Sequence, residues 1–67
     1  MNYSQWAQEY YDSAETLKEI IHNLQNQLKT AALHELPDLN FRINTMRGMY
    51  TECMRVGNIL VKRKGEV

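Results

Sequence analysis

A heptad repeat of apolar residues runs through the first half of this chain. Residues 4–33 contain neither glycine nor proline, so nothing in this stretch interrupts a helix. The apolar positions alternate steps of four and three residues, which is the spacing of a coiled-coil seam. They are Tyr3, Ala7, Tyr10, Ala14, Leu17, Ile21, Leu24, Leu28 and Ala31. The repeat predicts one α-helix over residues 3–33, about 45 Å long at 1.5 Å per residue.

The same spacing resumes after a predicted turn at residues 34–37. Pro37 disfavours helical backbone geometry at Leu36 and suits the first turn of a new helix. We therefore predict a second helix over residues 38–64, ended by Gly65. The second set of seam positions is Leu36, Leu39, Ile43, Met46, Tyr50, Cys53, Gly57 and Leu60.

Side chains near both predicted N-termini are suited to stabilise them. Asn2 or Ser4 is expected to cap the first helix, because either side-chain oxygen can accept a hydrogen bond from a free backbone N–H group. Asp38 favours the start of the second helix through the helix dipole and can pair with Arg42, four residues further on.

Two long helices joined by a short turn predict an all-α fold. The expected architecture is an antiparallel, coiled-coil-like helical hairpin that forms a single domain over residues 1–67. If the turn is centred near residues 35 and 36, positions whose numbers sum to about 71 face each other. Gly57 is then expected opposite Ala14.

The distribution of charge favours this antiparallel arrangement. Residues 1–35 carry two basic and five acidic residues, a net charge of −3. Residues 36–67 carry six basic and three acidic residues, a net charge of +3, and we expect the two halves to lie alongside each other. Each exposed ion pair contributes less than about 1 kcal/mol, so the asymmetry acts mainly against parallel alternatives.

A hairpin of 67 residues has little interior, and its one cysteine cannot form an internal disulfide. No paired Cys and His spacing indicates structural zinc either.

Apolar residues outside the seam are numerous, which is typical of a protein–protein interface. They are Trp6, Tyr11, Ile20, Met49, Met54, Val56, Ile59 and Val61. We expect them to form an oligomer interface in which two hairpins pack as a homodimeric four-helix bundle. A helix of another protein or a larger homo-oligomer is the alternative.

Four sulfur-containing residues lie close together in the second half and carry the soft ligands that select Cu(I). They are Met46, Met49, Cys53 and Met54. On a helix, two of them lie on the seam and two flank it on opposite sides, so they do not converge on one ion. We interpret all four as adaptable apolar filling beside an interface.

Other candidate chemistry is equally sparse. Glu19 and His22 have the spacing of half a carboxylate-bundle metal motif, but both fall on the solvent side of the first helix. Cys53 is expected to be an inert thiol, because its predicted neighbours are apolar or seam residues. No Ser/His/Asp set or glycine-rich phosphate loop is present in the sequence. We expect no enzyme activity, no metal site and no cofactor.

Nucleic-acid binding is the alternative function, because the second helix is basic and ends in VKRKG at residues 61–65. The net charge of zero argues against it.

The first residues lack the features of a signal peptide, and the longest unbroken apolar runs have three residues, too few to cross a bilayer. The free cysteine fits a reducing compartment, so we expect a cytoplasmic protein without a membrane partner.

Residues 42–53 follow the pattern RI-x2-M-x2-MY-x2-C. Placed after a long acidic first helix and a short turn, this pattern resembles short two-helix proteins of Gram-positive bacteria and their mobile elements, most of which are uncharacterised. The resemblance covers most of the chain and implies a small bacterial accessory protein. It carries over no functional residues.

Overall fold

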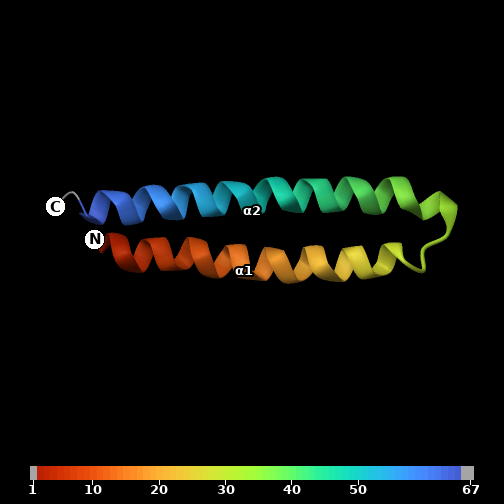
Figure 1. Cartoon of the computed structure of the whole chain (residues 1–67), viewed down its shortest axis with the longest axis horizontal. Helices are drawn as coiled ribbons and strands as arrows, with labels where there is room; N and C mark the ends of the chain where they lie inside the picture. Colours follow the sequence, from red (N-terminus) through yellow and green to blue (C-terminus); the bar gives the residue numbers. More distant parts are fainter. Residues whose placement is uncertain (1, 66–67) are drawn as a thin grey trace.

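The computed structural model describes residues 2–65, with side chains for residues 2–63. Helix α1 spans Tyr3–Leu28, a short 3-10 helix η1 spans Leu33–Glu35, and helix α2 spans Leu36–Gly65. Helices α1 and α2 lie side by side and antiparallel, so that the start of α1 and the end of α2 meet at the same end of the molecule (Figure 1). The described residues contain no strand, and the prediction of an all-α hairpin is confirmed.

Helix α1 begins with a side-chain cap. Asn2 has extended backbone angles of φ −97° and ψ 109°, and its Oδ1 accepts a hydrogen bond of 3.0 Å from the Ser4 N–H group. Of the two predicted caps, Asn2 is therefore the one that is formed.

Helix α1 ends at Leu28, five residues before the predicted end, so this boundary of the prediction was wrong. The N–H groups of Lys29 and Thr30 each bond a carbonyl three residues back at 3.2 Å, and Ala32 is extended at φ −70° and ψ 155°. Alanine-rich sequence would allow the helix to continue. The chain must leave it early because closing the hairpin takes several residues to reach the facing helix.

Helix α2 starts at Leu36 instead of residue 38, and the expectation that Leu36 would be non-helical was also wrong. Leu36 has φ −60° and ψ −44°, and its N–H group bonds the Leu33 carbonyl, so η1 runs directly into α2. Pro37 costs little here, since an N–H group in the first helical turn has no intrahelical acceptor. Glu35 closes the turn by accepting a 3.3 Å bond from the Ala32 N–H group.

Every predicted seam position is buried or half-buried, so the heptad assignment is confirmed. The core near the turn consists of Leu24, Leu39 and Ile43, with half-buried Ile21, Leu28, Ala31 and Met46 packed against it. The opposite half of the hairpin holds the start of α1 and the end of α2. The most buried seam residues of α1 in this half are Ala7 and Ala14. We call this the terminal half of the hairpin. The apolar core of the terminal half is thinner than the core near the turn.

The helices pair in a different register from the predicted one. Gly57 lies against Tyr11 instead of opposite Ala14, so the facing positions sum to 68 where about 71 was expected. The difference follows from the connection. Because α1 stops at Leu28 and residues 29–35 form the turn, the turn is centred on residue 32, earlier in the chain than the predicted centre at residues 35 and 36.

Candidate interaction surface

The seam divides the hairpin into two long edges. The seam residues occupy heptad positions a and d, with Ala7 at a and Tyr10 at d in α1, and Leu36 at a and Leu39 at d in α2. The e residue follows each d residue, and the g residue precedes each a residue. Antiparallel helices bring their g positions together along one edge and their e positions together along the other. Tyr11, an e residue of α1, donates a 2.7 Å hydrogen bond to Asn58 of α2 and so marks the e edge. Near the turn, the g residues Gln27 and Arg42 line a common open hollow and mark the g edge.

The eight predicted interface residues do not divide equally between these edges. Five lie on or beside the g edge: Trp6 and Ile20 of α1, and Met49, Val56 and Ile59 of α2. Val56 is half-buried, and the other four are exposed. The other three, which are Tyr11, Met54 and Val61, lie on the e edge.

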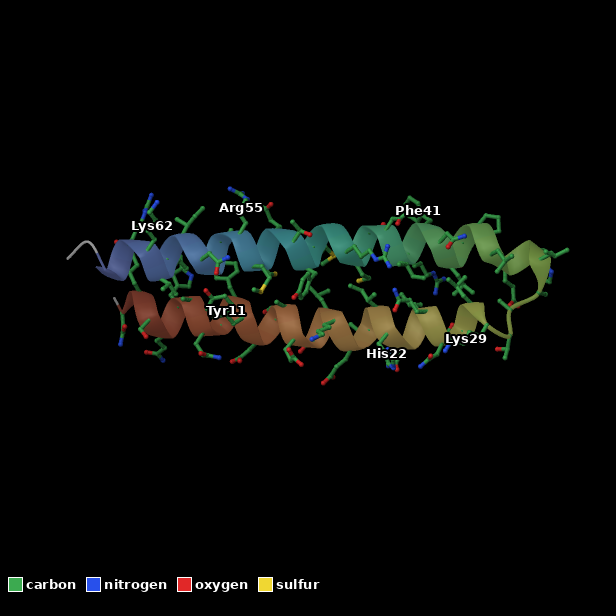
Figure 2. The ribbon with its side chains drawn as sticks, in the orientation of Figure 1. Tyr11, His22, Lys29, Phe41, Arg55 and Lys62 are labelled. Carbon is green, nitrogen blue, oxygen red and sulfur yellow. The ribbon has the colours of Figure 1, made fainter. Side chains whose placement is uncertain are left out.

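Tyr11 has a role within the hairpin that the sequence did not suggest. Its ring is half-buried, lies on the side of α1 that faces α2 (Figure 2), and packs against Gly57. Its hydroxyl group bonds Asn58. Tyr11 therefore contributes less free apolar surface than predicted. The g edge is the more apolar of the two.

Two exposed apolar residues were missed by the sequence reasoning. Leu33 is 85% exposed in η1, and Phe41 is 71% exposed on α2, where it points away from α1 (Figure 2). Leu33 was missed because it was assigned to the first helix. The heptad spacing places Phe41 opposite the seam, and this signal was available in the sequence.

The sulfur-containing residues are spread over different sides of α2. Met46, Cys53 and Met54 are half-buried, while Met49 is 49% exposed on the g edge. Among the side chains of residues 2–63, no three His, Cys, Asp or Glu groups come together as a possible metal site.

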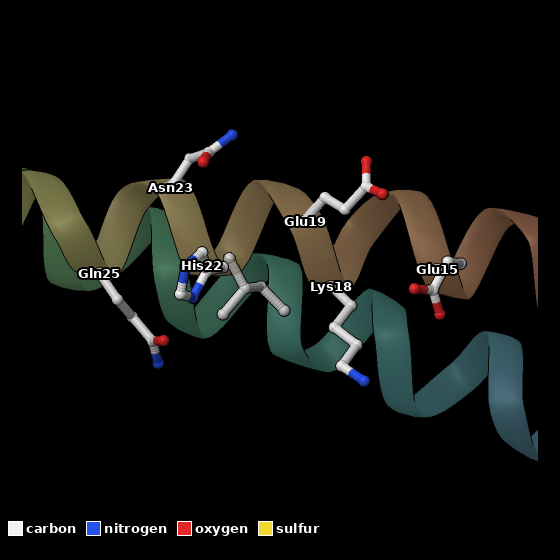
Figure 3. A pocket seen from close by; sticks show the side chains of 7 residues that line it. Glu15, Lys18, Glu19, His22, Asn23 and Gln25 are labelled. Atoms are coloured by element: carbon white, nitrogen blue, oxygen red, sulfur yellow. The ribbon is translucent and has the colours of Figure 1, made fainter.

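An open hollow of about 500 Å³ lies along α1 beside His22. All of its lining residues come from α1 (Figure 3), and Glu19 and Asn23 extend to one side while Lys18 and Gln25 extend to the other. Glu19 and His22 are both exposed, as predicted. This surface does not enclose a ligand or aim several functional groups at one point.

The ion pairs of the described side chains form within α2 or within the turn. Asp38 and Arg42 pair at 3.2 Å, which confirms that prediction. Arg55 donates a hydrogen bond to the Glu52 carboxylate, and this bond and the positive charge of Arg55 lower the pKa of Glu52. The same bond and the negative charge of Glu52 raise the pKa of Arg55. Arg55 and Lys62 point away from α1 (Figure 2), which explains why neither pairs with α1 among the described residues. The basic half as a whole was expected beside the acidic half, and the side chain of Lys64, one of its basic residues, lies outside the described residues.

The fold and its surfaces place the chain in the broad class of antiparallel helical hairpins. Comparison with protein-family models, with curated protein sequences and with solved structures gave no match. Neither α1 nor α2, over the part of the chain described, has an apolar stretch of the length needed to span a bilayer.

Proposed function

We propose that this protein is a small, non-enzymatic protein–protein interaction module that acts as a homo-oligomer, with two hairpins packed into a four-helix bundle. The proposal rests on the thinness of the core. No large side chain among the described residues is fully buried, and the most buried positions, Ala7 and Ala14, are small. A lone hairpin of this kind has little apolar burial to offset the entropy of ordering its chain.

The shape of the molecule supports the same conclusion. The Cα radius of gyration is 15.5 Å, whereas a compact domain of this length has about 11 Å. The accessible surface is 5182 Å², whereas a compact monomer of 7.9 kDa exposes about 4,400 Å². The excess is roughly 800 Å², which is about what each partner buries in a protein–protein interface of standard size.

Sedimentation equilibrium, with and without duplex DNA and over a range of salt concentrations, tests this proposal. We expect a dimer of about twice the 7.9 kDa chain mass that is insensitive to salt and does not bind the DNA. A stably folded monomer would overturn the proposal. Tight DNA binding that weakens steeply with salt would favour the basic residues of α2 as a nucleic-acid site instead.

A further inference from the structure

The two edges of the hairpin differ in charge as well as in apolar content. The e edge carries Lys18 and Arg47 between its apolar residues, and part of its apolar surface is already covered by the packing of Tyr11 on Gly57. The g edge carries two carboxylates beside its apolar residues: Glu52, which is bound by Arg55 of the same helix, and Glu9, which lies beside Trp6. The g edge therefore costs less to remove from water.

Two threonines beside the g edge have their hydroxyl hydrogen bonds satisfied within their own helices. Thr16 donates to the Asp12 carbonyl at 3.2 Å, and Thr45 donates to the Phe41 carbonyl at 2.9 Å. If a partner covered these threonines, each hydroxyl donor would keep its acceptor, so their burial carries a small penalty.

The apolar part of the g edge lies in the terminal half and the middle of the hairpin. In the register set by Tyr11 and Gly57, Met49 is level with about residue 19 of α1 and Ile59 with about residue 9. Both therefore fall between Trp6 and Ile20, a span of about 21 Å along the axis at 1.5 Å per residue. Towards the turn, the same edge becomes polar, with Gln27, Thr30, Asp38 and Arg42 around an open hollow.

This apolar strip lies beside the thinner part of the core. Leu24, Leu39 and Ile43 fill the turn half, whereas the terminal half buries Leu60 together with the small residues Ala7, Ala14 and Gly57. A second layer of side chains on the g edge would supply the burial that these small residues do not.

The occupant that fits this strip best is a second copy of the chain. The formal net charge is zero and the strip is nearly neutral, so two copies can approach without electrostatic repulsion. Glu9 lies beside Trp6 and level with Ile59, and Arg63 follows Ile59 on the same edge. These charged groups at the terminal end of the strip can form the polar rim of a self-complementary interface. We propose that two hairpins associate through the g edge, at Trp6, Ile20, Met49, Val56 and Ile59. This inference rests on the proposed homo-oligomer and specifies its interface.

Matched charge substitutions on the two edges test the assignment. Met49 and Val61 are exposed to a similar extent, 49% and 46%, but lie on the g and e edges respectively. We expect Met49→Glu, and Ile20→Glu on the other helix, to weaken dimerisation at least about tenfold, because a charge would be desolvated within the interface. Val61→Glu should change the dimer dissociation constant less than about threefold. Circular dichroism at matched concentration shows whether each variant remains helical.

The single tryptophan gives a second readout that needs no substitution. Trp6 lies on the g edge, so its emission should shift to shorter wavelength as the wild-type protein is concentrated and dimerises. A wild-type dimer in which Trp6 stays exposed to quencher, or in which Val61→Glu dissociates the protein and Met49→Glu does not, overturns the g-edge assignment alone. A wild type that stays monomeric overturns both this inference and the proposed function.

Discussion

The ring of Tyr11 on α1 occupies the space that a side chain at position 57 of α2 would need. A Cβ atom built on Gly57 would lie 2.8 Å from Tyr11 Cε1 and 3.2 Å from two further ring atoms. The same tyrosine donates a 2.7 Å hydrogen bond to Asn58, the next residue of α2. A ring packed against a glycine and an adjacent hydrogen bond together hold one alignment of the two helices, since sliding either helix by a turn would break both.

Gly57→Ala should destabilise the hairpin although alanine is the better helix former. The helical preference of alanine favours the variant by about 1 kcal/mol, but displacing a ring that is anchored to Asn58 is an overpacking change that costs about 1–3 kcal/mol. Urea unfolding at fixed protein concentration would measure the balance, for which we expect a net loss of about 1 kcal/mol. In a Tyr11→Ala background the same substitution should become stabilising. A stabilising Gly57→Ala in the wild-type background would show that the ring moves freely.

Gly48→Ala is the matched control on the same helix. A Cβ atom at Gly48 meets no atom within 4 Å, and the residue is exposed on the side of α2 away from α1. We expect this substitution to raise the free energy of unfolding by up to about 1 kcal/mol, because helix propensity acts alone. The dimer dissociation constant should not change, since Gly48 is not on the g edge. Weaker dimerisation of Gly48→Ala would place a second chain against this face of α2.

Tyr11→Phe should separate the hydrogen bond from the packing of the ring. The variant keeps the ring on Gly57 and loses the bond to Asn58, for which we expect a loss of about 0.5–1.5 kcal/mol in unfolding free energy. Asn58→Ala should cost less, because the helix preference of alanine offsets part of the lost bond, and the double variant should cost less than the two single losses combined. Fully additive losses in this cycle would mean that the two groups do not interact in solution.

Asn2→Ala should remove the cap of α1. The Asn2 side chain accepts from the Ser4 N–H group at 3.0 Å, and loss of such a cap costs about 1 kcal/mol. Ser4→Ala is the matched control, because Ser4 lies inside the helix and contributes only its backbone N–H to this bond. Thermal unfolding followed by circular dichroism should show a lower Tm for Asn2→Ala only. An equal drop for both variants would count against Asn2 as the functioning cap.

The pKa of Glu52 should lie below the ordinary glutamate value of 4.5, because Arg55 donates a hydrogen bond to the carboxylate and adds a positive charge beside it. A folded-state pKa below the unfolded value makes a contribution to stability that is present above pH 4.5 and is lost as the pH falls through the folded value. NMR titration of the glutamate carboxyl carbons would measure this. Arg55→Gln should raise the Glu52 pKa, whereas Arg47→Gln should change it less. An unchanged Glu52 pKa in Arg55→Gln would contradict the ion pair.

Periodicity alone was sufficient to predict which residues are buried. The side of a helix on which a residue lies depends only on its spacing from its neighbours, and all the seam positions from Tyr3 to Leu60 are at least half-buried. Short-range sequence spacing also predicted the Asp38–Arg42 pair, and the residue types at the start of α1 limited its cap to Asn2 or Ser4. These features need no knowledge of the partner helix.

The end of α1, the alignment of the helices and the character of the two edges were decided by tertiary structure. Alanine and threonine after Leu28 would tolerate a helix, and only the need to reach α2 unwinds it. The contact between Tyr11 and Gly57 joins residues far apart in the sequence, so no local pattern could reveal that one apolar edge is partly used within the hairpin. Local spacing determined the two helices and their buried seam. Packing between them determined which of the remaining apolar residues stay free to bind a partner.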